Sequence, residues 1–582
     1  MKRLKDRMHA CSAAMPKPRS FLLHLLLIAS CIANAAAAAD DAPLQEPTTP
    51  SSFQGEWKLL HASIGVSAMH MQLLPGDFVL MFDRTDTGPS NISLAALAPC
   101  ATTADGADCT AHSVLLDLRS NVLHPYPLAT NPWCSSGALL PNGTLLQTGG
   151  FSNGDRIARL FSPATGWVEL PSFLAARRWY ATDMILPDGR VLILGGRRQF
   201  NLEYFPHADA APALTFFPFL DETTEPDAEN NLYPFLHLLP DGTVFVFAND
   251  RAVVFDPYNR APLRRLPAVP GGVPRNYPSS GSSVLLPLRP DAPAHAEVLV
   301  CGGAPRGAYH LALRNGTFVP ADRTCARVAP TDPDPVVWAI EEMPMARVMG
   351  DMVLLPTGDV LIVNGAAAGT AGWELGREPV TRPVLYRPDA PLGARFDHAS
   401  SPLAASAVPR MYHSSAALDT YGRVLVGGSN PHVGYVFANV TYPTELSLEA
   451  FLPPYMDPRH DGARPRLLLA PDEVGYGEAT AVKFVIPAGM VAEGAGAGVE
   501  VVRVVAVAPA FATHSFGMNQ RVVELAVGRV AELEVGVYEA VVAAPPTPGV
   551  APPGYYMWFV VHAGVPSSSA AWVRMRPLGP AT

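Results

Sequence analysis

The segment DMILPDGRVLILGG, residues 183–196, decides the fold class of this chain. An apolar run leads into the turn Pro-Asp-Gly, and a second run rich in aliphatic residues ends in Gly-Gly. Such runs favour β-strands, and the glycine supplies the positive φ that a tight turn requires. The segment therefore predicts a β-hairpin.

The same pattern recurs along most of the chain. Its seven copies occupy residues 65–83, 137–150, 183–196, 236–250, 282–303, 351–365 and 415–428, and the fifth has a longer turn. The spacing leaves room for four strands per copy, which is typical of the blades of kelch-like propellers. A β-sandwich with many hairpins would explain the strands but not the repeated Gly-Gly. We therefore expect an all-β fold that begins with a seven-bladed kelch-like β-propeller.

The pattern changes after Asn439. Alternating apolar runs follow at residues 479–487, 499–507, 521–527, 532–543, 555–562 and 571–576. Short strands separated by proline and glycine predict an immunoglobulin-like β-sandwich. We place the propeller at residues 40–440 and the C-terminal domain at residues 441–582. The glycine-rich run at 494–498 is interpreted as a turn rather than a nucleotide-binding loop.

The N-terminus has the zones of a secretory signal peptide in their usual order. Basic residues extend to Arg19, an apolar run covers 21–32, and small residues at 35–39 offer a cleavage site. We assign residues 1–39 to a signal peptide and expect a secreted, extracellular protein, in the apoplast or cell wall if the source is a plant. No later apolar stretch is long enough to span a membrane. N-glycans are expected at the sequons of Asn91, Asn142, Asn315 and Asn439.

The charge pattern excludes one class of partner. The net charge is -10, and the only lysines beyond residue 40 are Lys58 and Lys483. Without a basic stripe, the chain is not expected to bind nucleic acid. It also offers few candidates for Schiff-base chemistry.

Five cysteines follow the predicted signal peptide, an odd number for an oxidising compartment. Cys100 and Cys109 are close enough to close a small loop, and Cys301 and Cys325 could close a longer one. Cys134 is then left over. It is either a buried, inert thiol or a reactive one, and the cysteine count alone does not decide between the two.

One position recurs in five of the hairpin units. Equivalent positions in successive blades of a propeller lie on a ring about its axis. Nine residues before the turn glycine lie Cys134, Tyr180, Tyr233, Met349 and His413, and Tyr412 precedes the histidine. Any one of these residues alone would be a rim side chain bonded to a loop. Together, a thiol, phenols and an imidazole on one ring indicate a metal or redox site at the axis.

Imidazole and phenolate ligands together suit Cu(II), whereas a structural zinc site would use several thiolates. A phenol has a pKa of about 10, so its coordination near neutral pH requires a metal that favours the anion. Two tyrosines and two histidines would complete such a shell. The sequence contains no HExxH motif and no P-loop that would indicate a different chemistry.

Five stretches resemble the glyoxal oxidase and galactose oxidase family of copper-radical oxidases, in its plant-type, glyoxal-oxidase-like form. They are WKLLHASIGVSAMHMQLLP (57–75), NPWCSSGALLPNG (131–143), RRWYATDMILPDGRVLILGG (177–196), PRMYHSSA (409–416) and APAFATHSFGMNQR (508–521). The resemblance runs from about residue 55 to the C-terminal strands.

The resemblance implies a role for five side chains. Cys134 is expected to be joined to Tyr180 by a thioether, which makes a tyrosyl radical easier to form. His413 and His514 are expected to be the imidazole ligands of one copper ion. Tyr180 is the implied equatorial phenolate ligand, and Tyr412 is the implied axial phenolate that accepts the substrate proton. The cofactors are therefore one copper ion and a radical made from the protein's own side chains.

The implied reaction oxidises small aldehydes such as glyoxal or methylglyoxal, as hydrates, to carboxylic acids and reduces dioxygen to hydrogen peroxide. Galactose oxidases carry a tryptophan shortly after the Gly-Gly of this blade, but Arg197 and Arg198 stand here, which favours aldehydes over galactose. Tyr233 and Tyr277 are candidates for the pocket lining, although rim packing is the expected role of each.

Two alternatives stay open. One is a galactose oxidase-like oxidase of alcohols or carbohydrates with the same copper site. The other is a non-catalytic kelch-type propeller that binds a protein or glycan.

Overall fold

The computed structural model describes residues 53–94, 100–103, 106–207, 213–226, 228–397, 402–486 and 502–578. The predicted signal peptide, the glycine-rich run 494–498 and the start of the run 499–507 lie outside the described residues. Within the described ranges, no helix is long and apolar enough to cross a membrane.

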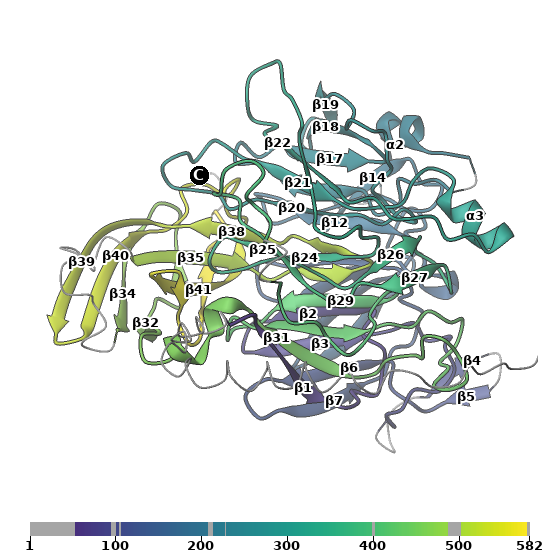
Figure 1. Ribbon diagram of the computed structural model, residues 1–582, viewed down its shortest axis with the longest axis horizontal. Helices are drawn as coiled ribbons and strands as arrows, with labels where there is room; N and C mark the ends of the chain where they lie inside the picture. Colours follow the sequence, from purple (N-terminus) through teal and green to yellow (C-terminus); the bar gives the residue numbers. More distant parts are fainter. Residues whose placement is uncertain are drawn as a thin grey trace, which may run out of the picture. The chain divides into compact units, whose positions relative to one another are not determined.

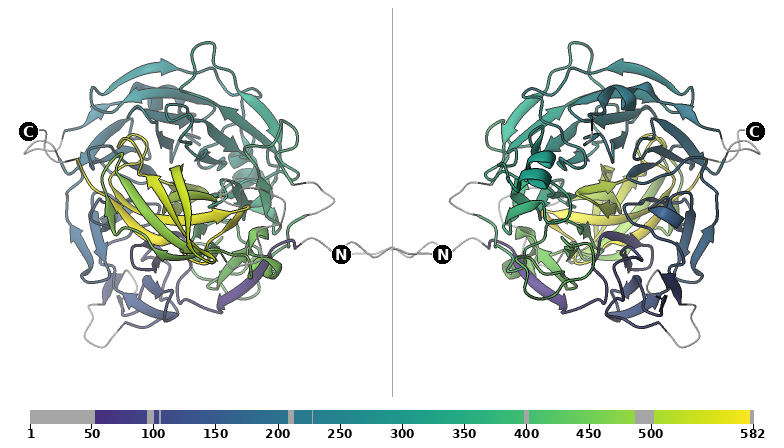
Figure 2. Two further views of the ribbon diagram at one scale, coloured as in Figure 1. Left: turned by 90° about the vertical axis from the view of Figure 1, so that its left-hand side faces the viewer. Right: turned by 90° about the vertical axis from the view of Figure 1, so that its right-hand side faces the viewer.

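Seven sheets form the blades of a β-propeller, as the sequence predicts. Figure 2 shows them arranged in a ring. Blade 1 contains β2 (His70–Leu74), β3 (Phe78–Phe82), β6 (Ser113–Asp117) and β7 (Val122–Tyr126). Blade 2 contains β8 (Ser136–Leu139), β9 (Leu145–Thr148), β10 (Ala158–Ser162) and β11 (Gly166–Leu170). Blade 3 contains β12 (Ala181–Ile185), β13 (Val191–Gly195), β14 (Asn201–Phe205) and β15 (Thr215–Phe216). Blade 4 contains β16 (Phe235–Leu238), β17 (Val244–Ala248), β18 (Arg251–Asp256) and β19 (Ala261–Arg265).

The remaining blades complete the ring. Blade 5 contains β20 (Ser282–Leu285), β21 (Val298–Cys301), β22 (Thr324–Val328) and β23 (Ala339–Glu342). Blade 6 contains β24 (Asp351–Leu354), β25 (Val360–Val363) and β28 (Val384–Tyr386), with the hairpin β26 (Ala366–Gly369) and β27 (Gly376–Pro379) inserted before its third strand. Blade 7 contains β29 (Ser414–Leu418), β30 (Val424–Gly428) and β31 (Leu448–Leu452). The first two strands of every blade are the hairpins predicted from the repeat.

The fourth strand of blade 7 comes from the start of the described chain. β1 (Glu56–His61) pairs antiparallel with β31, and Trp57 lies opposite Phe451. The two ends of the ring are thus held together by a β-ladder, which removes two exposed sheet edges. The repeat pattern does not predict this strand.

The Gly-Gly pairs permit close contact between successive blades. A Cβ at Gly149 would lie 1.9 Å from the carbonyl oxygen of Arg178, and one at Gly302 would lie 2.2 Å from that of Arg347. Both carbonyls belong to the segment that enters the next blade. A side chain at these positions would force the blades apart, which explains why the repeat ends in glycine.

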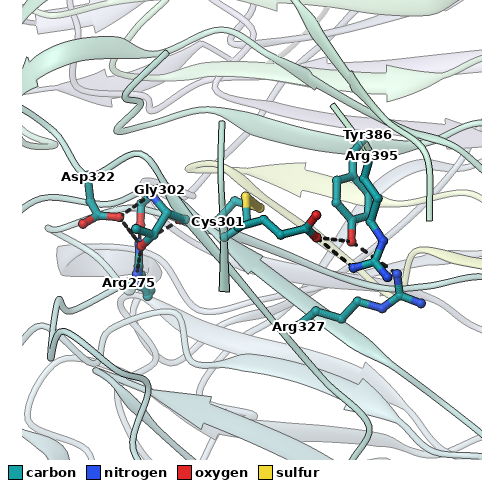
Figure 3. Close-up of a disulfide and its surroundings, with 10 residues drawn as sticks. Arg275, Cys301, Gly302, Asp322, Arg327, Tyr386 and Arg395 are labelled. Atoms are coloured by element: carbon teal, nitrogen blue, oxygen red, sulfur yellow. Dashed lines mark hydrogen bonds and ion pairs between the residues drawn. A yellow bond between two sulfur atoms is a disulfide. The ribbon is translucent and has the colours of Figure 1, made fainter. Parts of the chain in front are cut away.

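A buried arginine binds the carbonyl groups at the end of the second strand in five blades. The five are Arg159, Arg178, Arg275, Arg347 and Arg410. Figure 3 shows Arg275 donating to the Gly302 carbonyl oxygen and pairing with Asp322 at 2.9 Å. These guanidinium groups supply the hydrogen bonds that buried carbonyls need.

Both disulfides suggested by the sequence are present, Cys100–Cys109 and Cys301–Cys325. The first closes the loop that carries the short hairpin β4 (Ala101–Thr103) and β5 (Gly106–Asp108), and the second joins β21 to β22. Cys134 is buried and free, as expected from the odd count.

Two further sheets form the C-terminal β-sandwich, as predicted. One contains β32 (Arg466–Leu469), β34 (Ala479–Val485), β40 (Val537–Ala543) and β39 (Ala526–Glu534). The other contains β33 (Glu473–Val474), β43 (Ala571–Met575), β41 (Gly554–His562), β35 (Val502–Ala508) and β38 (Arg521–Glu524), with β42 (Val565–Pro566) at its side. Contacts join Phe53–Thr582 into one compact unit, and the boundary between residues 440 and 441 remains our proposal.

One predicted strand in this region is wrong. The run 532–543 was expected to be a single strand, but it contains the turn between β39 and β40. Gly536 has a φ of 76° and reverses the chain there, and an apolar run on both sides of the turn hid this reversal in the sequence.

Two strands leave the sandwich and enter the propeller. β36 (Phe511–Thr513) and β37 (Phe516–Met518) form a hairpin, and β36 pairs with β2. The hairpin contacts the innermost strand of every blade. The stretch between the predicted strands 499–507 and 521–527 is thus a hairpin that occupies the hub of the ring.

Two side chains just beyond the hairpin attach it to several blades. The Asn519 amide donates to the carbonyl oxygens of Gly137 and Asp183, both at 3.2 Å, and its oxygen accepts from the Ile185 N–H at 2.8 Å. The Gln520 amide donates to the Met352 carbonyl at 3.0 Å. These bonds position the hairpin along the axis.

The remaining elements are short. They are the helices α2 (Pro218–Thr223) and α3 (Ala308–Asn315) and the 3₁₀ turns η1 (Ser152–Gly154), η2 (Pro454–Met456) and η3 (Pro458–His460). In Figure 1, α3 lies beside the β26–β27 hairpin. Both belong to the face of the ring opposite the sandwich.

Candidate metal centre

The five positions that lie nine residues before a turn glycine do form one ring in the structure. The Tyr180 N–H donates to the Cys134 carbonyl and the Tyr233 N–H donates to the Tyr180 carbonyl, both at 2.9 Å. The five predicted ring residues all have left-handed backbone conformations, with φ of 54° at Cys134, 66° at Tyr180, 50° at Tyr233, 60° at Met349 and 60° at His413. This conformation is unfavourable for residues other than glycine. Its occurrence at all five positions indicates that the blade structure imposes it.

His514 lies at the centre of this ring, at the turn of the β36–β37 hairpin. Its φ is 44° and that of Ser515 is 69°, as in the tight turns of two-residue hairpins. The imidazole is buried, and its centroid lies 5.0 Å from that of His413 and 6.1 Å from that of Tyr180. The hub hairpin therefore brings a C-terminal residue among propeller residues that are distant in the sequence.

Three potential ligand atoms cluster here. One atom each of Cys134, His413 and His514 lie within 4.8 Å of one another, and all three residues are buried. The Cys134 Sγ lies 3.0 Å from the His514 Nε2. Thr513 Oγ1 lies 2.6 Å from His514 Nδ1, so the ring is held in place by a partner on its far side, as is typical of metal-binding histidines.

The two imidazoles are suited to metal binding. Neither ring nitrogen of His413 has a hydrogen-bond partner among the described residues, although both are buried. Burial lowers the pKa of His413 and of His514 well below the ordinary value, so both rings are neutral and keep a free lone pair. An unsatisfied buried imidazole is costly, and a cation at this point would satisfy it.

Three phenols form a chain beside the imidazoles. The Tyr180 hydroxyl donates to the Tyr277 hydroxyl at 3.2 Å, and the hydroxyls of Tyr277 and Tyr412 lie 2.9 Å apart. Burial raises the pKa of Tyr180 and of Tyr412 well above the ordinary value. Only a nearby cation would allow these phenols to ionise near neutral pH.

The Cys134 thiol is placed against Tyr180 and away from any other thiol of the described chain. Burial raises the pKa of the thiol well above its ordinary value, and a hydrogen bond with the Tyr180 side chain opposes this. A buried thiol with a raised pKa is a poor general nucleophile. Its neighbours make it a partner for Tyr180 rather than for an incoming reagent.

The structure brings together all five residues singled out by the sequence: Cys134, Tyr180, Tyr412, His413 and His514. Nitrogen and phenolic oxygen donors from separate blades fit a copper ion better than a zinc ion. The buried, unpaired nitrogens of His413 provide independent support for a metal.

Tyr277 has a larger role than the rim packing expected of it. Its ring stacks on that of Tyr180, with centroids 4.5 Å apart and an interplanar angle of 23°. Its ring therefore covers one face of the Tyr180 ring, and its hydroxyl forms hydrogen bonds with those of Tyr180 and Tyr412. The fixed offset could not find Tyr277 because the equivalent ring position of blade 5 is Ser280, which has a φ of 36° and accepts from the Met349 N–H at 2.7 Å. Tyr277 lies three residues earlier. Tyr233, in contrast, donates to the Ser135 carbonyl at 2.9 Å and packs edge-on against Tyr180.

A small pocket opens onto two of the site phenols, those of Tyr180 and Tyr277. It has a volume of about 70 Å³, and its walls include Tyr180, Tyr277, Tyr309 of α3, Arg197 and Glu229. Arg197 and Glu229 approach to 3.5 Å. The pocket thus combines two site phenols with a pair of opposite charges.

The chain is similar to known proteins over most of its length. Residues 69–455 match the family described as glyoxal oxidase N-terminus, and residues 464–575 match the galactose oxidase-like Early set domain. Aldehyde oxidase GLOX1 of Arabidopsis thaliana is 43% identical over 537 residues, which cover 90% of this chain and 85% of the relative. Aldehyde oxidase GLOX of Vitis pseudoreticulata is 43% identical over 536 residues, covering 90% and 98%.

A solved structure has a similar fold. A fungal alcohol oxidase of the AA5 family, in complex with copper, has a TM-score of 0.66 and 17% identity, covering 90% of this chain and 99% of its own. This likeness extends over both the propeller and the C-terminal sandwich.

Proposed function

The chain is an oxidase of the glyoxal oxidase family, and on this premise we propose that it is a copper-radical oxidase of small aldehydes. The observation that carries the proposal is the meeting of Cys134, Tyr180, Tyr412, His413 and His514 in the propeller hub. These residues come from three blades and from the C-terminal hairpin. A binding propeller without catalysis would not require this set of side chains.

We propose that His413, His514, Tyr180 and Tyr412 hold one copper ion. Both imidazoles are buried and neutral, so each can offer a nitrogen lone pair to a cation. Both phenols are buried with raised pKa values, so a cation is what would stabilise their anions. We further propose a thioether between Cys134 and Tyr180. A copper ion bound there would supply one of the two one-electron acceptors that the oxidation needs, together with the redox chemistry for reducing dioxygen.

The side chains divide the work of the oxidation. Tyr412, which no longer holds its own proton when it is a ligand, takes the hydroxyl proton of the aldehyde hydrate as a general base. The oxidised ring of Tyr180 takes the hydrogen atom from the substrate carbon. Both protons leave with dioxygen, so that RCH(OH)2 and O2 give RCOOH and H2O2. Tyr277 keeps the two phenols in register through its two hydrogen bonds.

The pocket supports a small substrate. Its volume of about 70 Å³ holds only a few water molecules, which favours glyoxal or methylglyoxal hydrates over a sugar ring. The Arg197 guanidinium in its wall can donate to a second oxygen of such a substrate. These features are our grounds for aldehydes rather than galactose.

We also propose that the protein is exported and glycosylated. The order of zones in residues 1–39 supports a signal peptide. The asparagines of the four sequons, Asn91, Asn142, Asn315 and Asn439, are all exposed, as glycan attachment requires.

Peptide mass spectrometry of the copper-loaded protein tests the proposal. The peptides that carry Cys134 and Tyr180 should be recovered as one cross-linked species, lighter than their sum by two hydrogens. Cys134→Ser should abolish the cross-link and the peroxide formed from methylglyoxal. A free Cys134 thiol in active, copper-replete enzyme would falsify the mechanism. A peroxide assay with glyoxal, methylglyoxal and galactose then ranks the substrates.

A further inference from the structure

Three tryptophans lie in contact, one after another, between the centre and the β26–β27 turn. Trp179 lies 4.7 Å from Tyr180 between ring centroids, and Trp133 lies 5.0 Å from Trp179. Trp373 stacks on Trp133 at 5.2 Å with an interplanar angle of 16°. We call Trp179, Trp133 and Trp373 the tryptophan chain.

Packing alone does not explain the choice of tryptophan. The indole N–H groups of Trp133 and Trp373 are buried and have no hydrogen-bond partner among the described residues. Such a group costs about 1–3 kcal/mol, and phenylalanine would fill much of the same space without this cost. Tryptophans elsewhere in the propeller do find acceptors: the N–H groups of Trp57, Trp167 and Trp338 donate to Ala404, Ser113 and Pro267.

An indole ring loses one electron far more easily than a phenyl ring does. Adjacent indoles can therefore pass an electron from ring to ring. Cys134 and Tyr180 are buried, with 0% and 4% of their surface exposed. Trp179 and Trp373 are each half-buried, but the Arg197 guanidinium lies over the Trp179 ring, 5.2 Å from its centroid, so Trp373 is the open end of the chain. An oxidant that is too large for the pocket can therefore contact the end of the chain but not Tyr180.

Arg84 makes Trp133 and Trp373 harder to oxidise. Its guanidinium lies 4.1 Å from the Trp133 centroid and 5.1 Å from that of Trp373, and only 3% of the residue is exposed. A fixed positive charge over both rings disfavours positive charge on them. An oxidised tryptophan therefore takes an electron from Tyr180. The unpaired electron then remains on Tyr180, and the tryptophans are oxidised only transiently.

We propose that the tryptophan chain lets an external one-electron oxidant oxidise Tyr180 without entering the pocket. The proposal rests on the proposed function, because it takes Tyr180 as the ring that forms the radical. One electron leaves the Tyr180 phenolate, passes through Trp179, Trp133 and Trp373, and reduces one molecule of oxidant. In the copper-loaded protein, where Tyr180 would be held as a phenolate, this transfer forms and breaks no bond and moves no proton.

The experiment follows radical formation in the copper-loaded full-length protein after mixing with hexachloroiridate(IV), a bulky one-electron oxidant. Stopped-flow absorbance gives the rate, and its end point gives the final amount of radical. Trp133→Phe and Trp373→Phe should each slow the rate by about tenfold or more, equivalent to about 1.4 kcal/mol of barrier. The final amount should not change. Trp57→Phe, a half-buried tryptophan outside the chain, is the matched control and should react at the parent rate.

Each other outcome has a defined meaning. Parent rates in both Trp133→Phe and Trp373→Phe would overturn the proposal, including the case in which only Trp179→Phe is slow. Trp373→Tyr, which keeps an oxidisable ring, should be faster than Trp373→Phe, and equal rates would also count against the chain. If the parent protein forms neither the Cys134–Tyr180 cross-link nor a radical, the proposed function itself fails.

Discussion

Tyr277→Phe removes one oxygen atom from the centre and leaves the stacked ring in place. In the structure this oxygen lies 3.2 Å from the Tyr180 hydroxyl and 2.9 Å from that of Tyr412. A hydrogen bond contributes about 0.5–1.5 kcal/mol net, so the two together contribute up to about 3 kcal/mol. If both keep the reacting phenols in register, kcat/KM should fall by about 10- to 100-fold.

The assay is the initial rate of peroxide formation with methylglyoxal, at several substrate concentrations. The loss is expected mainly in kcat, because Tyr277 acts through Tyr180 and Tyr412 rather than through substrate affinity. Copper content and the Cys134–Tyr180 cross-link should stay at parent levels.

Tyr233→Phe is the matched control. Tyr233 is a buried tyrosine on the same ring, but its hydroxyl donates to the Ser135 backbone and not to a site phenol. It should retain kcat within about threefold. Parent kcat in Tyr277→Phe, or an equal loss in both variants, would refute the argument that Tyr277 organises the phenols.

Three further predictions concern stability. Burial raises the pKa of Asp351 from 3.8 to about 7, so the folded state binds its proton more tightly and stability falls as pH rises from about 4 to 7, by up to about 4 kcal/mol. The free energy of unfolding, measured with guanidinium at several pH values, should not show this fall in Asp351→Asn. Asp241→Asn, at an exposed turn, should show the same pH dependence as the parent. The same pH dependence in all three proteins would contradict the prediction. Removing copper with a chelator should lower the Tm in calorimetry, because a ligand at 1,000 times its Kd stabilises the folded protein by about 4 kcal/mol. If copper removal lowers the Tm of His514→Ala by as much as that of the parent, His514 is not a copper ligand. Ser515→Gly should stabilise the copper-free protein by about 1 kcal/mol, since the left-handed turn residue has a φ of 69°; a lower Tm would count against strain at this turn.

The repeat alone predicts most of the propeller, because its signals are local. A Pro-Asp-Gly turn between two apolar runs specifies a hairpin wherever it occurs, and seven hairpins at blade spacing specify a ring. Radial equivalence then places Cys134, Tyr180 and His413 at one level of the axis before any contact is known. His514 was found only through resemblance to the family, since nothing local distinguishes it from an ordinary histidine in a turn.

Other features depend on contacts between distant segments, and no local pattern encodes them. β1 joins blade 7 only because ring closure brings residue 56 beside residue 452. Tyr277 stacks on Tyr180, and Trp373 on Trp133, because loops of different length from separate blades turn toward the same axis. The sequence by itself thus determined the hairpins, their number and the ring of chemically active residues. Only the tertiary structure decided what covers Tyr180 and what connects it to the surface, because loop paths depend on the packing of whole blades and not on local periodicity.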